Sequence, residues 1–223
     1  MGAGDKEVDL SIIIPVYNEE DSIRSVLERV KELPIEKEII VVDDCSRDRT
    51  YEILKEIDGI RLIRHEQNRG KGAAIRTGLT HAKGRFTIIQ DADLEYPVEV
   101  IPKLLIRGSD IVYGSRMLGR SRFLFLSYWA NRLLSLLTSL LYNHRITDME
   151  TCYKLIRTDL LKALKLKANR FDIEPEITAK LLRSGHRITE IPIDYIGRKR
   201  GKKIGVKDGI SAILTLLRYR IFR

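Results

Sequence analysis

Strand-like and helix-like stretches alternate along the chain, and this alternation constrains the fold more than any other feature. The strand-like runs are almost continuously apolar, as expected for parallel strands that are buried on both faces. They predict strands at residues 8–17, 36–44, 60–65, 85–93, 109–115 and 186–195. Helices are expected from about residue 20, at 48–57, at 70–84 and around 97–105. Because short loops join these elements, we expect an α/β fold with a doubly wound, mostly parallel sheet flanked by helices.

The second half is less regular. It holds an apolar helical segment at 123–142, a connector at 145–157 and a helix at 174–185. A basic run, GRKRGKKIG, and a C-terminal amphipathic helix follow. The 223 residues are enough for one large core but few for two, so we expect a single domain over residues 1–223.

Polar and charged residues follow the ends of the predicted strands. Ligands of open α/β sheets bind beyond the carboxyl ends of the strands, so these residues mark the expected site. They are Pro15, Tyr17, Glu19, Asp43, Asp44, Asn68, Gly70, Lys71, Asp91, Asp93 and Arg116.

The stretch FTIIQDADLEYP places three carboxylates directly after a buried strand. Side chains two residues apart share one face of an extended chain, so Asp91, Asp93 and Glu95 could converge on one hard cation. Mg²⁺ and Mn²⁺ prefer such oxygen ligands and often share them with substrate phosphates. The alternative for this stretch is a polar loop between strand and helix, capped by an aspartate.

Several nucleotide-binding classes lack their motif in this chain. No GxGxxG follows the first strand, and NRGKGAA lacks the leading glycine and the hydroxyl of a P-loop. The 40 basic and 31 acidic residues leave a net charge of +9, which favours anionic partners. The basic residues are dispersed and few aromatic residues lie among them, so we expect no nucleic-acid partner.

A nucleotide-sugar transferase accounts for more of these residues. Asp43 or Asp44 could accept hydrogen bonds from a base or ribose, and a metal at Asp91 and Asp93 would hold a diphosphate. Lys71 and Arg116 could neutralise further phosphate charge.

The motifs SIIIPVYNEE, VVDDCSRDRT, NRGKGAAIRTG, DADLEYP and GSR, in this order, resemble those of family 2 glycosyltransferases with the GT-A fold. They are most similar to dolichol-phosphate mannose synthases and related polyprenyl-phosphate glycosyltransferases. The resemblance continues through TDMETCYKLIR, RFDIEPEITAKLLRSGHRITEIPIDYIGR and GKKIGVKDGISAI, so it spans nearly the whole chain.

The resemblance implies roles for individual residues. A nucleotide-binding part would cover about residues 8–118 and an acceptor- or membrane-facing part about 119–223. The nucleotide pocket would be lined by Pro15, Tyr17, Glu19, Asp43, Asp44, Lys71 and Gly72. The metal ligands, for Mg²⁺ or Mn²⁺, would be Asp91, Asp93 and Glu95, the last at a place where mannose synthases often carry glutamine. The basic groups around the diphosphate and the acceptor phosphate would be Arg116, Arg132, Arg198 and Lys202.

The implied reaction inverts the sugar's anomeric centre and moves a hexose from GDP-mannose or UDP-glucose to dolichyl or polyprenyl phosphate. A lipid phosphate is already ionised, so it needs positioning more than a general base. A hydroxyl acceptor on a glycan or small molecule would need one, for which Asp148 or Glu150 are candidates. A non-catalytic nucleotide- or nucleic-acid-binding module is the alternative from another class.

Each candidate also has an ordinary structural explanation. Asp44 could cap the following helix, Lys71 could be solvated at a helix start, and Arg132 could extend from an apolar helix to water. Glu174 could be a first-turn helix acid, and the run at 197–205 could be a solvated loop.

The segment Phe123–Tyr142 and the tail Ile210–Phe222 combine large apolar residues with arginine, as helices lying in a membrane surface do. Packing on the sheet or in a homodimer is the alternative. We expect a peripheral protein on the cytosolic face of a membrane, or one that works with a separate membrane subunit. The two cysteines, Cys45 and Cys152, form no disulfide framework, which favours the cytoplasm.

Overall fold

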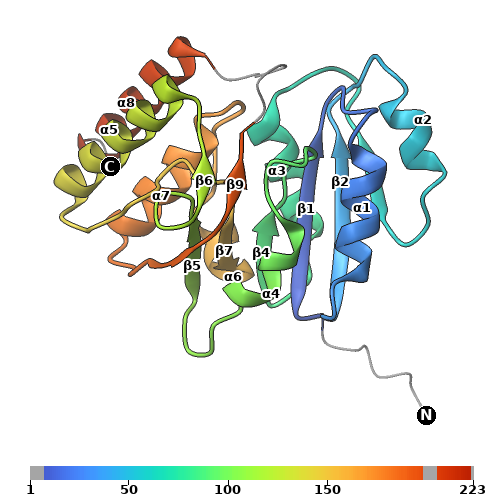
Figure 1. Ribbon diagram of the computed structural model, residues 1–223, viewed down its shortest axis with the longest axis horizontal. Coiled ribbons are helices and arrows are strands. Elements are labelled where there is room, and N and C mark those ends of the chain that lie inside the picture. The colour runs from blue at the N-terminus through green and yellow to red at the C-terminus, as the bar shows by residue number, and fades with distance from the viewer. Residues whose placement is uncertain (1–7, 198–204, 222–223) are drawn as a thin grey trace.

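A seven-stranded sheet runs through the centre of the protein, with helices on both of its faces (Figure 1). The structure is a computed structural model that describes residues 8–197 and 205–221. In spatial order the strands are β3 (Arg61–Arg64), β2 (Lys37–Asp43), β1 (Leu10–Val16), β4 (Phe86–Ile89), β7 (Lys154–Arg157), β5 (Ile111–Ser115) and β8 (Thr189–Pro192). The short strands β6 (Ser121–Arg122) and β9 (Tyr195–Ile196) pair separately.

The sheet is parallel except at one strand. β1 pairs with β2 and β4, β2 with β3, and β5 with β8, all in parallel. β7 runs antiparallel between β4 and β5. The expected α/β fold with a mostly parallel sheet is therefore confirmed.

β7 corrects the interpretation of residues 145–157 as a connector. Its sequence, KLIR, is short and has charged ends, so no alternating pattern marks it as a strand. Pairing with a strand on each side decides its structure. The strand expected at 85–93 also ends early, at Ile89, and the chain bends at residues 92–96, directly after Asp91.

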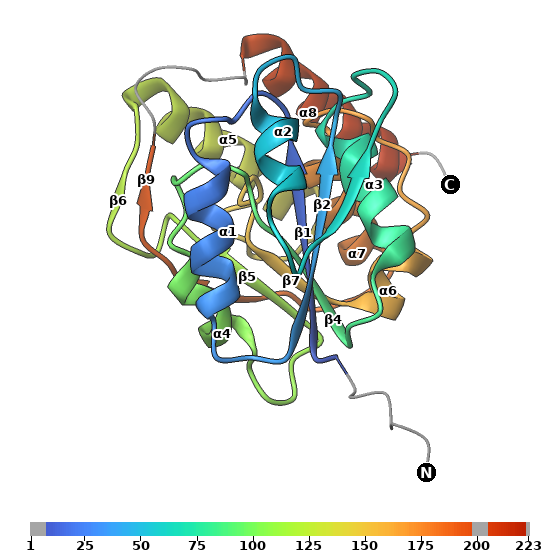
Figure 2. The ribbon, with the colours of Figure 1, turned by 90° about the vertical axis from the view of Figure 1, so that its right-hand side faces the viewer.

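The helices lie close to where the sequence predicts them. They are α1 (Ile23–Glu32), α2 (Thr50–Lys55), α3 (Lys71–His81), the 3-10 turn η1 (Val98–Val100) leading into α4 (Ile101–Leu104), α5 (Phe125–Tyr142), α6 (Thr158–Ala163), α7 (Ile173–Arg183) and α8 (Val206–Ile221). Only α6 has no counterpart among the expected elements. Figure 2 shows α1 and α4 on one side of the sheet and α3 and α6 on the other.

The core lies between the sheet and these helices. Every residue of β1 is buried, and so are the last five residues of β2. α3 approaches β1 closely at Gly78, where a Cβ atom would lie 2.6 Å from Cγ2 of Ile13. The rigid contact between α3 and β1 fixes the start of α3 relative to the carboxyl edge of the sheet.

α5 and α8 pack side by side at one end of the molecule (Figure 1). The Tyr142 hydroxyl donates a hydrogen bond to the carbonyl of Leu216, at 2.8 Å, and Leu216 and Leu134 are buried. Both helices therefore use one face for internal packing. Among the described residues, no helix is both long and apolar enough to cross a bilayer.

Candidate active site

Four charged side chains of alternating sign, those of Asp91, Lys71, Glu174 and Lys154, form a row at the carboxyl edge of the sheet. The ammonium of Lys71, the first residue of α3, lies 2.7 Å from the Asp91 carboxylate and 3.4 Å from Glu174. Lys154, fully buried at the start of β7, lies 2.6 Å from the other oxygen of Glu174. Three elements distant in sequence and the loop after β4 therefore meet at one point.

Neighbouring charges in this row stabilise the ionised forms of one another. Burial opposes the ionisation of Lys71, but the Asp91 and Glu174 carboxylates raise its pKa well above the ordinary value. Burial equally opposes the charge on Asp91, yet Lys71 and a hydrogen bond from the Cys152 thiol lower its pKa. Asp91 is therefore an anion at neutral pH, ready to accept a cation.

Asp44 anchors the loop before α3. Its carboxylate accepts backbone N–H bonds from Arg69 at 2.8 Å and Gly70 at 2.7 Å, and lies 2.7 Å from Nδ1 of His65. The other ring nitrogen of His65 lies 2.9 Å from the Thr77 hydroxyl. In the structure, the contacts of Asp44 therefore hold the loop before α3. Its place in a nucleotide pocket stays a prediction.

Asp43 is fully buried at the end of β2. It accepts the backbone N–H of Ser46 at 3.2 Å and pairs with Arg64 at 3.2 Å. The Arg64 guanidinium also covers the Tyr51 ring, 3.9 Å from its centroid. Asp43 and Asp44 thus face different partners, although they are neighbours at the end of the same strand.

Pro15, Tyr17 and Glu19 lie at and just after the end of β1, as expected. Pro15 is buried, whereas Tyr17 and Glu19 are partly exposed. The Glu19 carboxylate accepts a hydrogen bond from the Ser22 hydroxyl at 3.1 Å, and its backbone N–H donates to Thr50 at 2.8 Å.

Gly70 and Gly72 let the start of α3 touch a second loop. A Cβ atom on Gly70 would lie 2.3 Å from the carbonyl oxygen of Asn169, and one on Gly72 would lie 2.6 Å from that of Ala168. Gly70 also has a φ of 95°, which favours glycine. In this structure Gly72 therefore faces the 168–170 backbone; its predicted nucleotide contact stays a prediction.

The three predicted metal ligands do not converge. Asp93 accepts the backbone N–H of Glu95 at 3.1 Å, and the Glu95 carboxylate accepts a hydrogen bond from the Tyr195 hydroxyl. Within residues 8–197 and 205–221, no three His, Cys, Asp or Glu side chains form a group that could hold a metal. The bend at residues 92–96 explains this, because it ends the alternation that would place the three side chains on one face.

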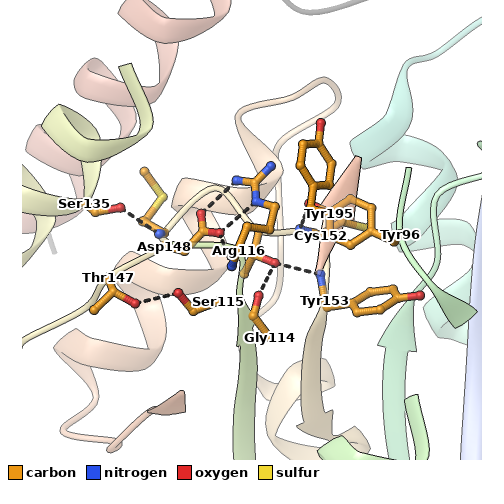
Figure 3. Close-up of polar contacts among 12 residues, drawn as sticks. Tyr96, Gly114, Ser115, Arg116, Ser135, Thr147, Asp148, Cys152, Tyr153 and Tyr195 are labelled. Carbon is orange, nitrogen blue, oxygen red and sulfur yellow. Dashed lines mark hydrogen bonds and ion pairs between the residues drawn. The ribbon is translucent and has the colours of Figure 1, made fainter. Parts of the chain in front are cut away.

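Arg116, directly after β5, is buried against Asp148 and aromatic rings (Figure 3). Its Nε and Nη2 donate to the two oxygens of Asp148 at 2.7 and 2.8 Å. The guanidinium lies 5.1 Å from the Tyr195 ring centroid and 5.5 Å from that of Phe123. Within the described part of the chain, Nη1 has no hydrogen-bond partner and remains available to a ligand.

Arg132 lies on α5, exposed, beside the Tyr128 ring at 5.9 Å. The rings of Phe123 and Tyr128, with centroids 6.0 Å apart, connect this position to Arg116. The structure thus brings both arginines to one side of the sheet edge without direct contact. Arg198 and Lys202 lie outside the described residues.

Sequence reasoning missed the internal partners of these groups. The sequence predicts no role for Lys154 and indicates only a first-turn helix acid at Glu174, yet Glu174 pairs with both Lys71 and Lys154. Glu190 was also missed: it accepts the backbone N–H groups of Thr147 and Asp148 and so holds the Asp148 loop. The stretch FDIEPE holds three acids, Asp172, Glu174 and Glu176, and this density at a helix start is the signal that could have marked Glu174.

The geometry supports binding of a polyanion and a cation together. Asp91 and Asp93 supply carboxylate oxygens, and Lys71 and Arg116 supply cations, all at the carboxyl edge. Mg²⁺ commonly takes one or two protein carboxylates and completes its shell with water and substrate phosphates. The donor set therefore fits a divalent ion bound together with a diphosphate.

Comparison with known proteins agrees with this site. The profile described as Glycosyl transferase family 2 matches residues 11–165, more than half of the chain. The chain therefore belongs to glycosyl transferase family 2.

Two named relatives show the range of this family. A dolichol-phosphate mannosyltransferase of Pyrococcus furiosus is 30% identical over 86% of this chain and 58% of its own. An undecaprenyl-phosphate 4-deoxy-4-formamido-L-arabinose transferase of Edwardsiella ictaluri is 32% identical over 93% of this chain and 65% of its own. The chain thus spans less than two thirds of either relative.

A solved structure shows the same fold. Glucosyl-3-phosphoglycerate synthase from Mycobacterium tuberculosis, in complex with Mn²⁺, UDP and glucosyl-3-phosphoglycerate, is 20% identical with a TM-score of 0.74. The match covers 97% of this chain and 81% of that one. The same enzyme has also been crystallised with Mg²⁺ and UDP. The expected GT-A glycosyltransferase fold is confirmed.

Proposed function

We propose that this protein transfers a hexose from a nucleoside-diphosphate sugar to dolichyl or polyprenyl phosphate, with inversion at the anomeric carbon. The observation that carries the proposal is the Lys71–Asp91 pair, an anion and a cation at the carboxyl edge of a GT-A sheet. Named relatives act on dolichol phosphate and undecaprenyl phosphate, which supports a lipid phosphate acceptor.

The donor would lie along the ends of β1, β2 and β4. We assign the base and ribose to Pro15, Tyr17, Glu19, Asp43 and Asp44, and the diphosphate to Lys71 and the loop at Gly72. Asp91 and Asp93, and Glu95 if it leaves Tyr195, would hold Mg²⁺ or Mn²⁺. Once bound, the ion supplies Lewis-acid stabilisation of the charge that grows on the leaving diphosphate. Mannose is the favoured sugar, on the resemblance alone, with glucose second.

The acceptor would approach from the side of Arg116. The bond between the anomeric carbon and the diphosphate oxygen breaks, its electron pair leaves with the nucleoside diphosphate, and an acceptor phosphate oxygen bonds to that carbon. No proton has to move, because the attacking oxygen is already an anion. The free Nη1 of Arg116 suits this oxygen, and Arg132, Arg198 and Lys202 would add positive charge.

The lipid part of the acceptor would lie against α5 and α8. Exposed apolar side chains recur every three or four residues along α5, at Leu126, Trp129, Leu133, Leu136 and Leu140, so they share one face. Ile210, Leu214 and Ile221 form a similar row on α8. We infer that these rows rest on the cytosolic surface of a membrane, with a separate membrane subunit or a homodimer as further partners.

A donor screen tests the proposal. The protein would be incubated with Mg²⁺ or Mn²⁺, a short polyprenyl phosphate and either GDP-mannose or UDP-glucose. We expect metal-dependent release of nucleoside diphosphate and formation of a glycolipid with one donor. Asp91→Asn should lower turnover by about 10²–10³-fold or more, because the developing diphosphate charge loses its cation.

Controls separate the site from the fold. Asp110→Asn changes an exposed carboxylate of a surface pair with Arg157 and should leave turnover unchanged. Circular dichroism should show both variants folded. Binding of neither donor by the wild-type protein would rule out the transferase function.

A further inference from the structure

Glu150 lies on a loop whose backbone is fixed almost residue by residue. The Met149 N–H donates to the Ser135 hydroxyl at 3.0 Å, and the Cys152 N–H donates to the Tyr96 hydroxyl at 3.1 Å (Figure 3). The Thr151 hydroxyl donates to the carbonyl of Gly114 at 2.7 Å. The position of Glu150 is therefore set by α5, β5 and the loop before η1, and not by its own side chain.

Glu150 lies within electrostatic reach of both ion clusters of the site. Two residues before it, Asp148 holds Arg116, and both Arg116 and Lys154 act on the Glu150 carboxyl group. The carboxyl group therefore lies near the arginine assigned to the acceptor.

Unlike the other acids of the site, Glu150 has no partner among the described residues. Its Oε1 is enclosed and makes no hydrogen bond. The charged groups around it are Lys154 on β7, Glu174 on α7, Arg116 after β5 and Asp148 on its own loop. Two cations and two anions nearly cancel, and each is already paired with another of the set or with Lys71.

Glu150 is partly exposed as a residue, but its Oε1 is enclosed, so desolvation dominates the charge state of the carboxyl group. Desolvation raises its pKa to about 7, and Lys154 acts in the opposite sense. An ionised carboxylate without a partner is costly in such a place, whereas the protonated acid carries one O–H donor.

A phosphate acceptor offers what this group lacks. Its oxygens only accept hydrogen bonds, and an ionised carboxylate beside them would repel the acceptor. Building on the proposed function, we propose that Glu150, in its protonated form, donates a hydrogen bond to an oxygen of the acceptor phosphate and so positions it for attack. Glu150 thereby favours a phosphate over a hydroxyl acceptor, for which the same group would have to act as a base.

Two variants test this role through the pH dependence of kcat/KM for a short polyprenyl phosphate between pH 5.5 and 9. The wild-type value should fall about tenfold per pH unit above about pH 7, where Glu150 ionises. Glu150→Gln keeps an N–H donor that does not titrate, so its activity should persist to pH 9. Glu150→Ala should raise KM for the acceptor about tenfold at pH 6 and leave KM for the donor unchanged. The second ionisation of the acceptor phosphate affects the wild type, Glu150→Gln and Glu150→Ala alike, so it does not explain a difference between their pH profiles.

A second measurement detects the protonation of Glu150 through protein stability, without a catalytic assay. The folded protein binds a proton on Glu150 that the unfolded chain releases near its ordinary pKa. The urea midpoint of the wild type should therefore fall as pH rises from about 4.5 through 7, relative to that of Glu150→Gln. Glu99→Gln, an exposed carboxylate paired with Arg29, should follow the wild-type curve in both experiments.

Three results would overturn the assignment. Glu150→Gln could lose activity at every pH while the wild type glycosylates a hydroxyl, which would make Glu150 a general base. All variants could share the wild-type pH profile and KM, which would leave Glu150 without a role. A wild-type protein that binds the donor but forms no glycolipid at any pH would overturn the proposed function itself, and this role with it.

Discussion

The two sides of the candidate site hold their carboxylates in different ways. On the β2 side, Asp44 is held by two backbone N–H groups and a histidine from the loop that follows β3. On the β5 side, Asp148 and Glu174 are held by buried cations from other segments. The first arrangement depends mainly on backbone donors of one loop, whereas the second depends on buried ion pairs.

The largest difference should appear when one partner of a buried pair is removed. Asp148→Ala leaves Arg116 buried without a counter-ion, so we expect a loss of about 3–5 kcal/mol in the free energy of unfolding. Glu56→Ala breaks an exposed pair with Arg24 and should cost at most about 1 kcal/mol. Urea denaturation at pH 7 measures both. Equal losses would show that the β5 side does not depend on its ion pair.

The contact between α3 and the 168–170 loop joins the two sides of the site. A glycine substitution tests how closely α3 and this loop must pack. Gly72→Ala places a methyl group 2.6 Å from the carbonyl oxygen of Ala168, so we expect a destabilisation of about 1–3 kcal/mol. Gly209→Ala, on α8 with no atom within 4 Å of the new Cβ, should be neutral or stabilise by up to about 1 kcal/mol. If Gly72→Ala were as stable as the wild type, the 168–170 loop would be able to move away from α3 at no cost in stability.

The smallest effect concerns the surface of α5. Replacing Leu133 and Leu140 by serine removes two exposed apolar groups, so affinity for anionic lipid vesicles should fall about tenfold while stability stays unchanged. Sedimentation with vesicles of mixed anionic and neutral lipid measures the affinity, and neutral vesicles separate charge from apolar contact. Unchanged binding to both would contradict the membrane assignment.

The sequence predicts the β2 side of the molecule well. The apolar runs that become β1 and β2 are buried on both faces, so their pattern is strong, and the polar residues after them fall at strand ends as expected. The order of the elements follows from the same alternation.

The β5 side was harder to predict for a physical reason. Lys154 and Glu174 are 20 residues apart, and nothing local distinguishes a buried pair from two surface charges. The four-residue strand β7 carries no periodic signal and exists because β4 and β5 both pair with it. The bend at residues 92–96 likewise follows the early end of β4, so the alternation of a strand does not continue from Asp91 to Glu95.

The position of β7 also has a consequence for how the chain can fold during synthesis. β5 leaves the ribosome before β7 and β8, yet within residues 8–197 and 205–221 these two are its only partners in the sheet. Until residue 157 has been made, β4 and β5 each expose an edge that a neighbouring nascent chain could pair with. The strands β3, β2, β1 and β4 can therefore pair as soon as they are made, whereas β5 can join their sheet only through β7.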